Sequence, residues 1–523
     1  MIASLLCPQV KASRVNEFMI MNPPTETSVV PVLMRLEDRF LAVLVDHRDK
    51  PAVVESDRSW TFAEVDALAR HWAGRLRSQD GSRPAAVAVL AGRSATGYIG
   101  ALAALYADAV LVPINPMFPA VRNASMMAAT GVGMLIADVA ASRDLVAAIL
   151  AVHQVPVLWV DLSAQVPVSG AELDQRRSEI AYVLFTSGSS GSPKGVPISH
   201  ANVDAFLNAA LARYPMAPPD RLAQTYDLTF DLALASLFLA WSQGCAIVPA
   251  SVFAMADPAR LVARYGITVW TSVPSAIGLA KDAGTLVPGC LPSLRISMFA
   301  GEALTVDAAV TWSRAAPNSA VINNYGPTEL TMFCTAFTFR SDHPVEGPTV
   351  PIGHSFEGVE VAVVDTAGRP ADTGELLLRG AQMFSGYLDP SHNEMAFTEV
   401  DAPGGRWYRT GDLVRSGVDG LTYIGRLDDQ LQVGGYRVEP AEVEQVIRTS
   451  LGVTTAVAVQ RRNTIVAFVS PAPVAREPLL LIGEVLPAYM CPKHLVVVDE
   501  PRLNANGKID RGYYKERATE LRA

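Results

Sequence analysis

The residues best suited to chemistry lie in a loop within residues 182–200, YVLFTSGSSGSPKGVPISH. A hydrophobic run leads into a stretch of glycine, serine and threonine that holds one lysine, Lys194. Glycines let backbone N–H groups approach a polyphosphate closely, and hydroxyl and ammonium groups add donors and positive charge. The loop is not a Walker A motif, because that motif needs Ser or Thr after its lysine and Gly195 stands there. Taken alone, the loop is either a phosphate-binding loop of another kind or a flexible surface loop.

The elements around this loop predict an α/β body. From about residue 29, apolar helical stretches alternate with short β-branched runs, such as residues 85–90, 246–248, 269–272 and 297–300. Strands that alternate with longer helices imply βαβ units and largely parallel sheets.

The pattern changes after about residue 350. Short runs at residues 359–364, 375–379 and 422–424 are separated by turn dipeptides, which predicts antiparallel hairpins. The last hundred residues combine a predicted helix at 439–448 with strands at 454–459 and 464–470. We therefore expect a small separate α+β domain that begins near residues 426–429.

Bulk composition excludes several classes of protein. A chain of 523 residues exceeds the roughly 250–300 that one core usually supports, so more than one domain is expected. The formal charge of −9 argues against nucleic acid as the main partner. The five scattered cysteines favour reduced thiols over disulfides or a zinc site. Because no apolar run reaches the roughly 20 residues of a membrane helix, we expect a cytoplasmic protein without a membrane partner.

Several further motifs follow the loop in a fixed order. They are NNYGPTE at 323–329, GELLLRGAQMFSGY at 374–387, WYRTGDL at 407–413, GRLDDQLQVGGYRVEPAEVE at 425–444, LPAYMCP at 486–492 and LNANGKIDR at 503–511. Together with the FTSGSSGSPKG loop, they resemble the superfamily of acyl-CoA synthetases, peptide-synthetase adenylation domains and luciferases. The resemblance covers about residues 35 to 515.

The resemblance implies a fold and a domain division. The fold is α/β, with a large body of parallel-rich βαβ sheets, a small barrel-like β subdomain, and a small mobile C-terminal α+β domain. We expect an N-terminal extension at residues 1–28. Its first 25 residues have no family counterpart and are either a disordered extension or the result of a misassigned start, since Met19 and Met21 follow. The large adenylation domain then spans 29–427 and the small domain spans 428–523.

The resemblance also implies a site for ATP and Mg²⁺. Glu329 would bind the metal, because Mg²⁺ takes few carboxylates alongside phosphate oxygens. Asp412 would accept the ribose hydroxyls, Arg426 would lie near ribose and phosphate, and Asp428 would be the hinge. Lys508 would enter the site as a flexible ammonium on a mobile segment. The catalytic residues carried over are Lys508, Glu329, Thr186 and His200. The nucleotide-binding residues are Thr186, Ser187, Gly188, Ser189, Ser190, Gly191, Lys194, Asn324, Tyr325, Gly326, Thr328, Asp412, Arg426 and Lys508.

One motif departs from the family pattern. Gln432 stands where the family usually has lysine. This leaves the adenylation step supported but puts the rate or geometry of the thioester step in question.

The acid-binding segment indicates which acid is activated. Residues 226–241 align with the family's acid-binding helix, and Asp231 falls where amino-acid-activating members keep an aspartate. Its carboxylate would pair with the substrate ammonium; the alternative is an aspartate that caps the helix N-terminus. The other pocket residues carried over are Leu232, Ala235, Thr271, Met298, Ala300, Gly301, Asn324, Met332 and Phe333. None is charged, so we expect a small to medium hydrophobic or aromatic side chain on an α-amino or a β-amino acid.

The sequence has no Ser-centred phosphopantetheine attachment segment, so we expect transfer to the thiol of a separate carrier protein. This arrangement resembles D-alanine ligases and the free-standing β-amino acid ligases of macrolactam biosynthesis. The alternatives are an acyl- or aryl-CoA ligase that uses free CoA, and a non-catalytic nucleotide-binding protein on the same fold.

Overall fold

The computed structural model describes residues 33–56, 58–76, 82–163, 178–188, 193–399, 405–503 and 509–521. The predicted N-terminal extension lies outside the described residues, as do Ser189, Ser190, Gly191 and Lys508 of the predicted site.

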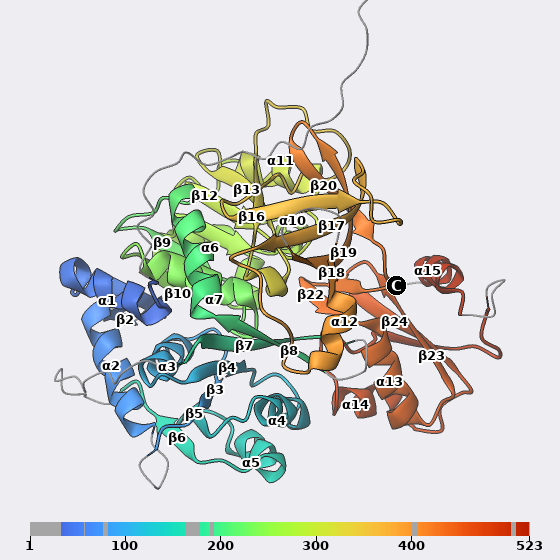
Figure 1. Cartoon of the computed structure of the whole chain (residues 1–523), viewed down its shortest axis with the longest axis horizontal. Helices are drawn as coiled ribbons and strands as arrows, with labels where there is room; N and C mark the ends of the chain where they lie inside the picture. Colours follow the sequence, from blue (N-terminus) through green and yellow to red (C-terminus); the bar gives the residue numbers. More distant parts are fainter. Residues whose placement is uncertain are drawn as a thin grey trace, which may run out of the picture. The chain divides into compact units, whose positions relative to one another are not determined.

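Two largely parallel sheets form the larger part of the described chain (Figure 1). The first has the strand order β6-β5-β3-β4-β7-β8, and only the β7–β8 pair is antiparallel. Its strands are β3 (Ala86–Leu90), β4 (Val110–Ile114), β5 (Met134–Asp138), β6 (Val157–Val160), β7 (Ile180–Thr186) and β8 (Lys194–Ser199). The β7–β8 hairpin carries the phosphate loop between its strands.

The second sheet has nine strands in the order β15-β14-β13-β12-β11-β9-β10-β1-β2. Its strands are β1 (Pro51–Glu55), β2 (Arg58–Thr61), β9 (Arg221–Gln224), β10 (Ala246–Pro249), β11 (Val269–Ser272), β12 (Ile296–Phe299), β13 (Ala320–Tyr325), β14 (Thr335–Phe339) and β15 (His354–Ser355). The strands from β1 to β13 in this order pair in parallel. The predicted parallel-rich α/β body is therefore confirmed.

Helices connect and cover these strands. They are α1 (Leu36–His47), α2 (Phe62–Arg75), α3 (Ala95–Tyr106), α4 (Ala120–Ala129), α5 (Arg143–Val152), α6 (His200–Arg213), α7 (Asp231–Trp241), α8 (Val252–Met255), α9 (Pro258–Tyr265), α10 (Ser275–Asp282) and α11 (Val306–Ala315). All residues of α7 are buried, as expected for a helix that is apolar on every side. This helix packs on β9 and β10 and begins at Asp231.

A third sheet follows, in the predicted antiparallel region. Its strands are β16 (Val359–Val364), β17 (Thr373–Gly380), β18 (Phe397–Glu399), β19 (Arg406–Gly417) and β20 (Gly420–Arg426), with the short helices η2 (Pro390–His392) and α12 (Asn393–Ala396) between β17 and β18. The order is β16-β17-β19-β18, and β20 pairs with β19. Among the described strands this unit is an open sheet. The expected barrel-like shape is corrected in that respect, because no pairing joins β16 to β18.

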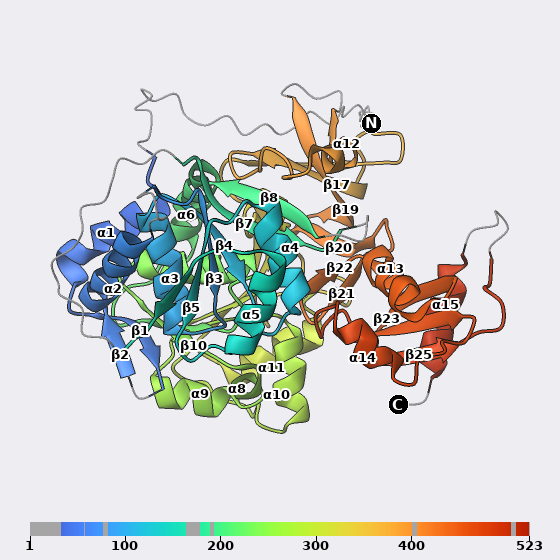
Figure 2. The same ribbon diagram turned by 90° about the horizontal axis from the view of Figure 1, so that it is seen from below.

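The C-terminal part contains the hairpin β21 (Leu431–Val433)–β22 (Tyr436–Val438) and a sheet of β23 (Thr455–Arg461), β24 (Thr464–Ser470) and β25 (His494–Val497). Its helices are α13 (Pro440–Leu451), α14 (Pro478–Gly483) and α15 (Arg511–Glu520). Helices α13 and α15 both pack on β23 (Figure 2). Two separate hydrophobic clusters cover this sheet, so the expected small α+β unit is present. The domain boundary between residues 427 and 428 stays a prediction.

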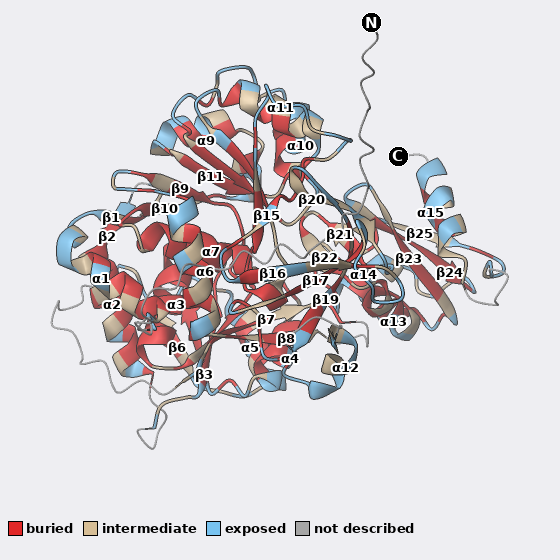
Figure 3. Cartoon of the chain, turned by 45° about the horizontal axis from the view of Figure 1, so that its top comes forward, coloured by how far each residue is buried: buried red, intermediate tan, exposed pale blue. Residues whose placement is uncertain are grey.

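Burial follows this layering. The strands are mostly buried, whereas the outer faces of the helices are exposed (Figure 3). Each of the four cysteines in the described ranges is free. Within those ranges, no helix is both long and apolar enough to cross a bilayer.

Gly353 connects the end of the nine-stranded sheet to β20, and substitution of this residue probes the contact between them. Its N–H donates to Leu421 O at 3.0 Å, and a Cβ at Gly353 would lie 2.1 Å from Ala336 O. Gly358 has nearly the same backbone, with φ +77 against +74, but nothing lies within 4 Å of its Cβ position. Gly358→Ala should lower the free energy of unfolding by about 1–2 kcal/mol through backbone strain alone. Gly353→Ala should cost about 1–3 kcal/mol more, because backbone atoms must shift.

Urea unfolding of the two variants, followed by far-UV circular dichroism, measures this difference. Equal losses would show that the contact at Gly353 relaxes without cost.

Candidate active site

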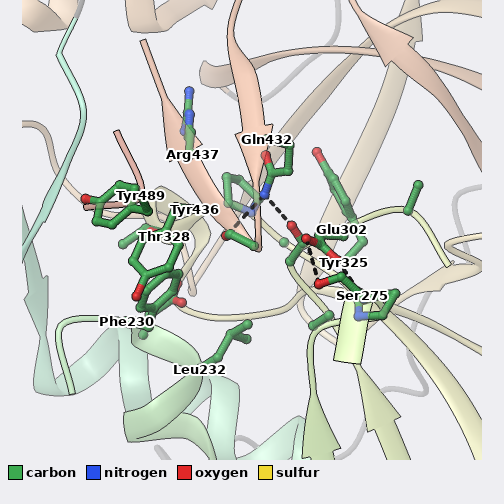
Figure 4. Close-up of a pocket in the computed structure, with 18 of the residues that line it drawn as sticks. Phe230, Leu232, Ser275, Glu302, Tyr325, Thr328, Gln432, Tyr436, Arg437 and Tyr489 are labelled. Atoms are coloured by element: carbon green, nitrogen blue, oxygen red, sulfur yellow. Dashed lines mark hydrogen bonds between the residues drawn. The ribbon is translucent and has the colours of Figure 1, made fainter. Parts of the chain in front are cut away.

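A cavity of about 670 Å³ is lined by half of the predicted site residues. Its wall comes from the N-terminus of α7, the ends of β7, β12 and β13, the β19–β20 pair, the β21–β22 hairpin, and helices α4, α10 and α11. Figure 4 shows Tyr436, Tyr489 and Phe230 on one side of it and Gln432, Glu302 and Ser275 on the other. Parts of the chain that are far apart in sequence thus meet around one space.

The phosphate loop reaches this cavity at Thr186 and Ser187. Ser187 Oγ donates to Arg437 O at 2.8 Å and accepts from Glu439 N at 2.9 Å. Gly188 N donates to Glu442 Oε2 at 3.1 Å. Ser187 Oγ and Gly188 N are therefore occupied by the chain itself in this arrangement.

Lys194 begins β8 and pairs with Thr186 across the hairpin. Its Nζ lies 5.7 Å from the centroid of the Tyr387 ring, within the range of a cation–π contact. Lys194 is not part of the cavity wall.

Glu329 sits on a short 3-10 helix, η1 (Thr328–Leu330), and is 1% exposed. The Tyr387 hydroxyl donates to Oε1 at 2.6 Å, and Arg437 Nη1 lies 3.3 and 3.2 Å from the two carboxylate oxygens. Burial alone would raise the pKa of Glu329, but the charge of Arg437 and the hydrogen bond from Tyr387 hold it below its ordinary value. Glu329 is thus a carboxylate kept ionised inside the protein.

These residues fit Mg²⁺ only together with phosphates. Among the described residues, no group of three or more His, Cys, Asp or Glu could hold a metal ion. Mg²⁺ commonly takes one or two carboxylates and completes its shell with water and substrate phosphate oxygens. Glu329, next to the phosphate loop, matches that donor set.

The predicted nucleoside residues come together at one end of the cavity. Asp412 accepts from the Tyr325 hydroxyl at 2.5 Å and from Arg426 Nη1 at 2.7 Å. Arg426 also pairs with Asp428 at 2.6 Å, and Asp428 Oδ1 accepts from Gln430 N. Tyr325, Asp412 and Arg426 line the cavity, whereas Asp428 does not. The predicted nucleotide residues Asn324, Gly326 and Thr328 also lie on the wall.

Asp231 is the first residue of α7 and lies on the cavity wall. The helix N-cap is Phe230, so the alternative of Asp231 as the capping residue is wrong. Burial raises the pKa of Asp231 to about 6, although hydrogen bonds from the Thr328 side chain and from backbone groups oppose the rise. No cation among the described residues pairs with Asp231 in this arrangement.

The other predicted acid-binding residues divide into two sets. Those on the cavity wall are Leu232, Ala300, Gly301, Asn324 and Phe333. Those buried away from it are Ala235, Thr271, Met298 and Met332. Phe333 lies on the cavity wall, and its ring packs edge-on against Phe206 at 5.0 Å and Tyr214 at 5.9 Å. The end of the cavity that begins at Asp231, which we call the acid end, is therefore shallower than the predicted acid-binding residues suggested.

His200 is not brought to the cavity. It is the first residue of α6 and is 2% exposed, with Nδ1 3.8 Å from Glu37 Oε2. Its catalytic role stays a prediction, as do the roles assigned to the other site residues.

Glu302 and Arg437 are two of the cavity residues that were missed from the sequence. Glu302 accepts from Ser275 N at 2.8 Å and from Ser275 Oγ at 3.1 Å, and burial raises its pKa. Arg437 pairs with Glu329, although only its motif was recognised. The sequence around Arg437 could have indicated a binding residue, because it places a cation beside a glycine-rich turn. The sequence around Glu302 has no comparable feature.

Comparison with known proteins assigns the family. Residues 41–388 match the model of the AMP-binding enzyme family, which is more than half of the chain. The chain is 31% identical, over 94% of its length, to phosphinothricin tripeptide synthetase PhsC of Streptomyces viridochromogenes, and it covers 48% of that protein. The chain thus belongs to the AMP-binding enzymes, the adenylate-forming superfamily.

Two solved structures are similar over nearly the whole chain. The crystal structure of IdnL7 is 39% identical, with a TM-score of 0.69, and the match covers 93% of this chain and 99% of that one. The adenylation domain AlmE of Vibrio cholerae, solved with glycyl-adenosine-5'-phosphate, is 26% identical with a TM-score of 0.82, covering 96% and 100%. The chain spans about half or less of the length of the first curated relatives it matches.

The raised pKa of Asp231 makes stability depend on pH. The folded-state value of about 6 exceeds the unfolded value of 3.8, so folding favours the protonated form. This contribution is complete below about pH 4 and is lost as the pH rises through about 6, a change of about 3 kcal/mol. Asp231→Asn should therefore raise the melting temperature at pH 7.5 but change it little at pH 4.5.

Calorimetric scans of the ligand-free protein across this range check the prediction. Asp144→Asn, at an exposed carboxylate in α5, is the matched control. An Asp231→Asn variant with the same pH profile as this control would show that Asp231 is ionised at no cost.

Proposed function

We propose that the chain activates a small amino acid as its aminoacyl-AMP, releases pyrophosphate, and passes the aminoacyl group to a thiol. The observation that carries this proposal is Asp231, a buried carboxylate on the cavity wall with no cationic partner among the described residues. A substrate ammonium is the group that such a carboxylate pairs with best. A fatty or aryl acid would leave the carboxylate buried without a partner, which is costly.

The nucleoside part of ATP fits the other end of the same cavity. Tyr325 offers an aromatic face, and Asp412 offers acceptor oxygens for ribose hydroxyls. Thr186 and Ser187 lie on the cavity wall where the phosphates would follow, and Glu329 would hold Mg²⁺, which would supply charge neutralisation there.

In the first half-reaction, the site contributes mainly by orienting the substrate carboxylate toward the α-phosphate of ATP. The substrate carboxylate is already an anion; its oxygen attacks the α-phosphorus, and the bond to pyrophosphate breaks. Lys508, which lies outside the described residues, is proposed to neutralise the charge that develops. In the second half-reaction a thiol sulfur attacks the carbonyl carbon, and AMP leaves.

The shallow acid end favours a small side chain. Leu232, Asn324 and Phe333 bound this end, and Phe333 is fixed by its aromatic neighbours. AlmE, the relative solved with a glycyl adenylate, fits the same preference. We therefore propose glycine-, alanine- or serine-sized substrates, in place of the medium or aromatic ones that the sequence left open.

The thiol has a route of entry that suits a tethered arm. The cavity wall continues along α10 and α11 to Lys281 and Asp307, whose side chains are 54% and 79% exposed. A phosphopantetheine arm on a separate carrier protein could reach the adenylate through this opening, with free CoA as the alternative acceptor. The proposal includes a large adenylation domain at residues 29–427 and a small mobile domain at residues 428–523.

Substrate-dependent ATP–pyrophosphate exchange over α-amino, β-amino, aryl and fatty acids tests the amine-recognition role. Small amino acids should drive exchange, and Asp231→Ala should reduce it by about 10²-fold or more, because the ammonium loses its buried partner. Asp144→Ala is the matched control. Exchange driven by acids without an amine would overturn this role and favour the CoA-ligase alternative.

Lys508 gives an independent test of the catalytic assignment. Lys508→Ala should reduce exchange by about 10²–10³-fold, the usual effect of removing one donor that stabilises transition-state charge. The control is Lys515→Ala, which removes an exposed lysine paired with Asp429 at 3.3 Å. Near-normal exchange in Lys508→Ala, with an unchanged melting temperature, would sink the assignment.

A further inference from the structure

Residues 437–442, which we call the 437–442 segment, bring one cation and one anion to the phosphate side of the cavity. Arg437 is in β22 and Glu442 is in the first turn of α13. Arg437 pairs with Glu329, and Glu442 accepts from Gly188 N. Each of these two contacts uses a group that the proposed function reserves for a ligand.

The cation occupies the proposed metal ligand. Arg437 Nη1 lies 3.2–3.3 Å from both oxygens of Glu329, and the Tyr387 hydroxyl occupies one of them as well. Glu329 is only 1% exposed, so little space remains for a second cation. Two positive charges on one buried carboxylate also repel each other strongly.

The anion occupies the phosphate loop. Glu442 Oε2 accepts the Gly188 N–H at 3.1 Å, while Oε1 accepts from Arg122 Nη1 at 2.6 Å. Both side chains of the Arg122–Glu442 pair are nearly fully buried. Ser187 Oγ is held between Arg437 O and Glu439 N. A phosphate oxygen would need the same donors.

We propose that the 437–442 segment is an internal substitute for magnesium pyrophosphate. Arg437 takes the place of the metal at Glu329, and Glu442 takes the place of a phosphate oxygen at Gly188. Seating of the segment and binding of magnesium pyrophosphate are therefore mutually exclusive. This inference rests on the proposed function, whose first half-reaction produces pyrophosphate.

The substitution separates the two halves of the nucleotide site. Tyr325, Asp412 and Arg426 remain on the cavity wall while the segment is seated, so the adenosine and acid ends stay available. The seated arrangement thus accommodates an acyl-adenylate but excludes ATP and pyrophosphate. Pyrophosphate release followed by seating prevents the reverse reaction before the thiol arrives.

Hydrogen exchange followed by mass spectrometry measures the seating directly. In the full chain, peptides spanning residues 436–446 should exchange slowly with AMP or Mg²⁺ alone, because the Glu439 amide donates to Ser187. Adding magnesium pyrophosphate should displace the segment and speed their exchange. Unchanged protection at saturating magnesium pyrophosphate would overturn the proposal.

Affinity gives the second readout. If the segment is seated about nine times in ten, it weakens the apparent binding of magnesium pyrophosphate by about tenfold. Titration calorimetry should therefore show up to about tenfold tighter binding for Arg437→Gln and Glu442→Gln. Arg409→Gln, which removes the guanidinium that pairs with Glu375 at 2.6 Å on the third sheet, is the matched control.

The two variants remove opposite charges, so a general electrostatic effect would move their affinities in opposite directions. Tighter binding of magnesium pyrophosphate by both variants than by Arg409→Gln supports the proposal that the segment takes its place. Unchanged or weaker binding by both variants overturns that proposal. If one variant fails to fold, the other and the exchange experiment still decide. Failure of every amino acid to drive ATP–pyrophosphate exchange would reject the proposed function alone, because neither readout here requires an acid.

Discussion

The burial of Glu329 is the constraint on which the rest of the site depends. A carboxylate with 1% exposure must have charged or hydrogen-bonding partners, because an isolated buried charge is very costly. Its partners come from separate parts of the chain, Tyr387 after β17 and Arg437 in β22. The requirement to satisfy one carboxylate thus holds the end of the nine-stranded sheet, the antiparallel sheet and the C-terminal hairpin against one cavity.

The connection that carries Glu329 is tightly constrained. Gly326 allows a close backbone approach, since a Cβ there would lie 2.3 Å from Met332 O. Thr331 and Met332 adopt positive φ values of 56 and 75, which are unfavourable for residues with side chains. Such strain persists only where the surroundings enforce it, and here it turns the Met332 backbone toward Asp231. The proposed metal ligand and the proposed amine ligand are therefore positioned by the same turn.

The resemblance of short motifs to the adenylate-forming superfamily predicted three residues that do meet at one end of the cavity. Tyr325, Asp412 and Arg426 lie in these motifs, and hydrogen bonds from Tyr325 and Arg426 to Asp412 join them in the structure. The alternating strands and helices follow from local periodicity. The depth of the acid end could not be predicted, because its wall depends on contacts between residues far apart in sequence, such as those of Phe333 with Phe206 and Tyr214 from α6 and its C-terminal end. The partners of Glu442 could not be predicted either, because Arg122 lies 320 residues away in the sequence.

Charge balance explains why Gln432 is compatible with this cavity. Its side-chain amide donates to Gly301 O and Gly435 O, so it holds the β21–β22 hairpin in place without adding a charge. Asp412 has Arg426 and Glu329 has Arg437, whereas Asp231 has no cation among the described residues. A lysine at position 432 would bring a competing positive charge to the same cavity. With a neutral amide there, Asp231 keeps no cationic partner among the described residues and is available for the substrate ammonium that we propose.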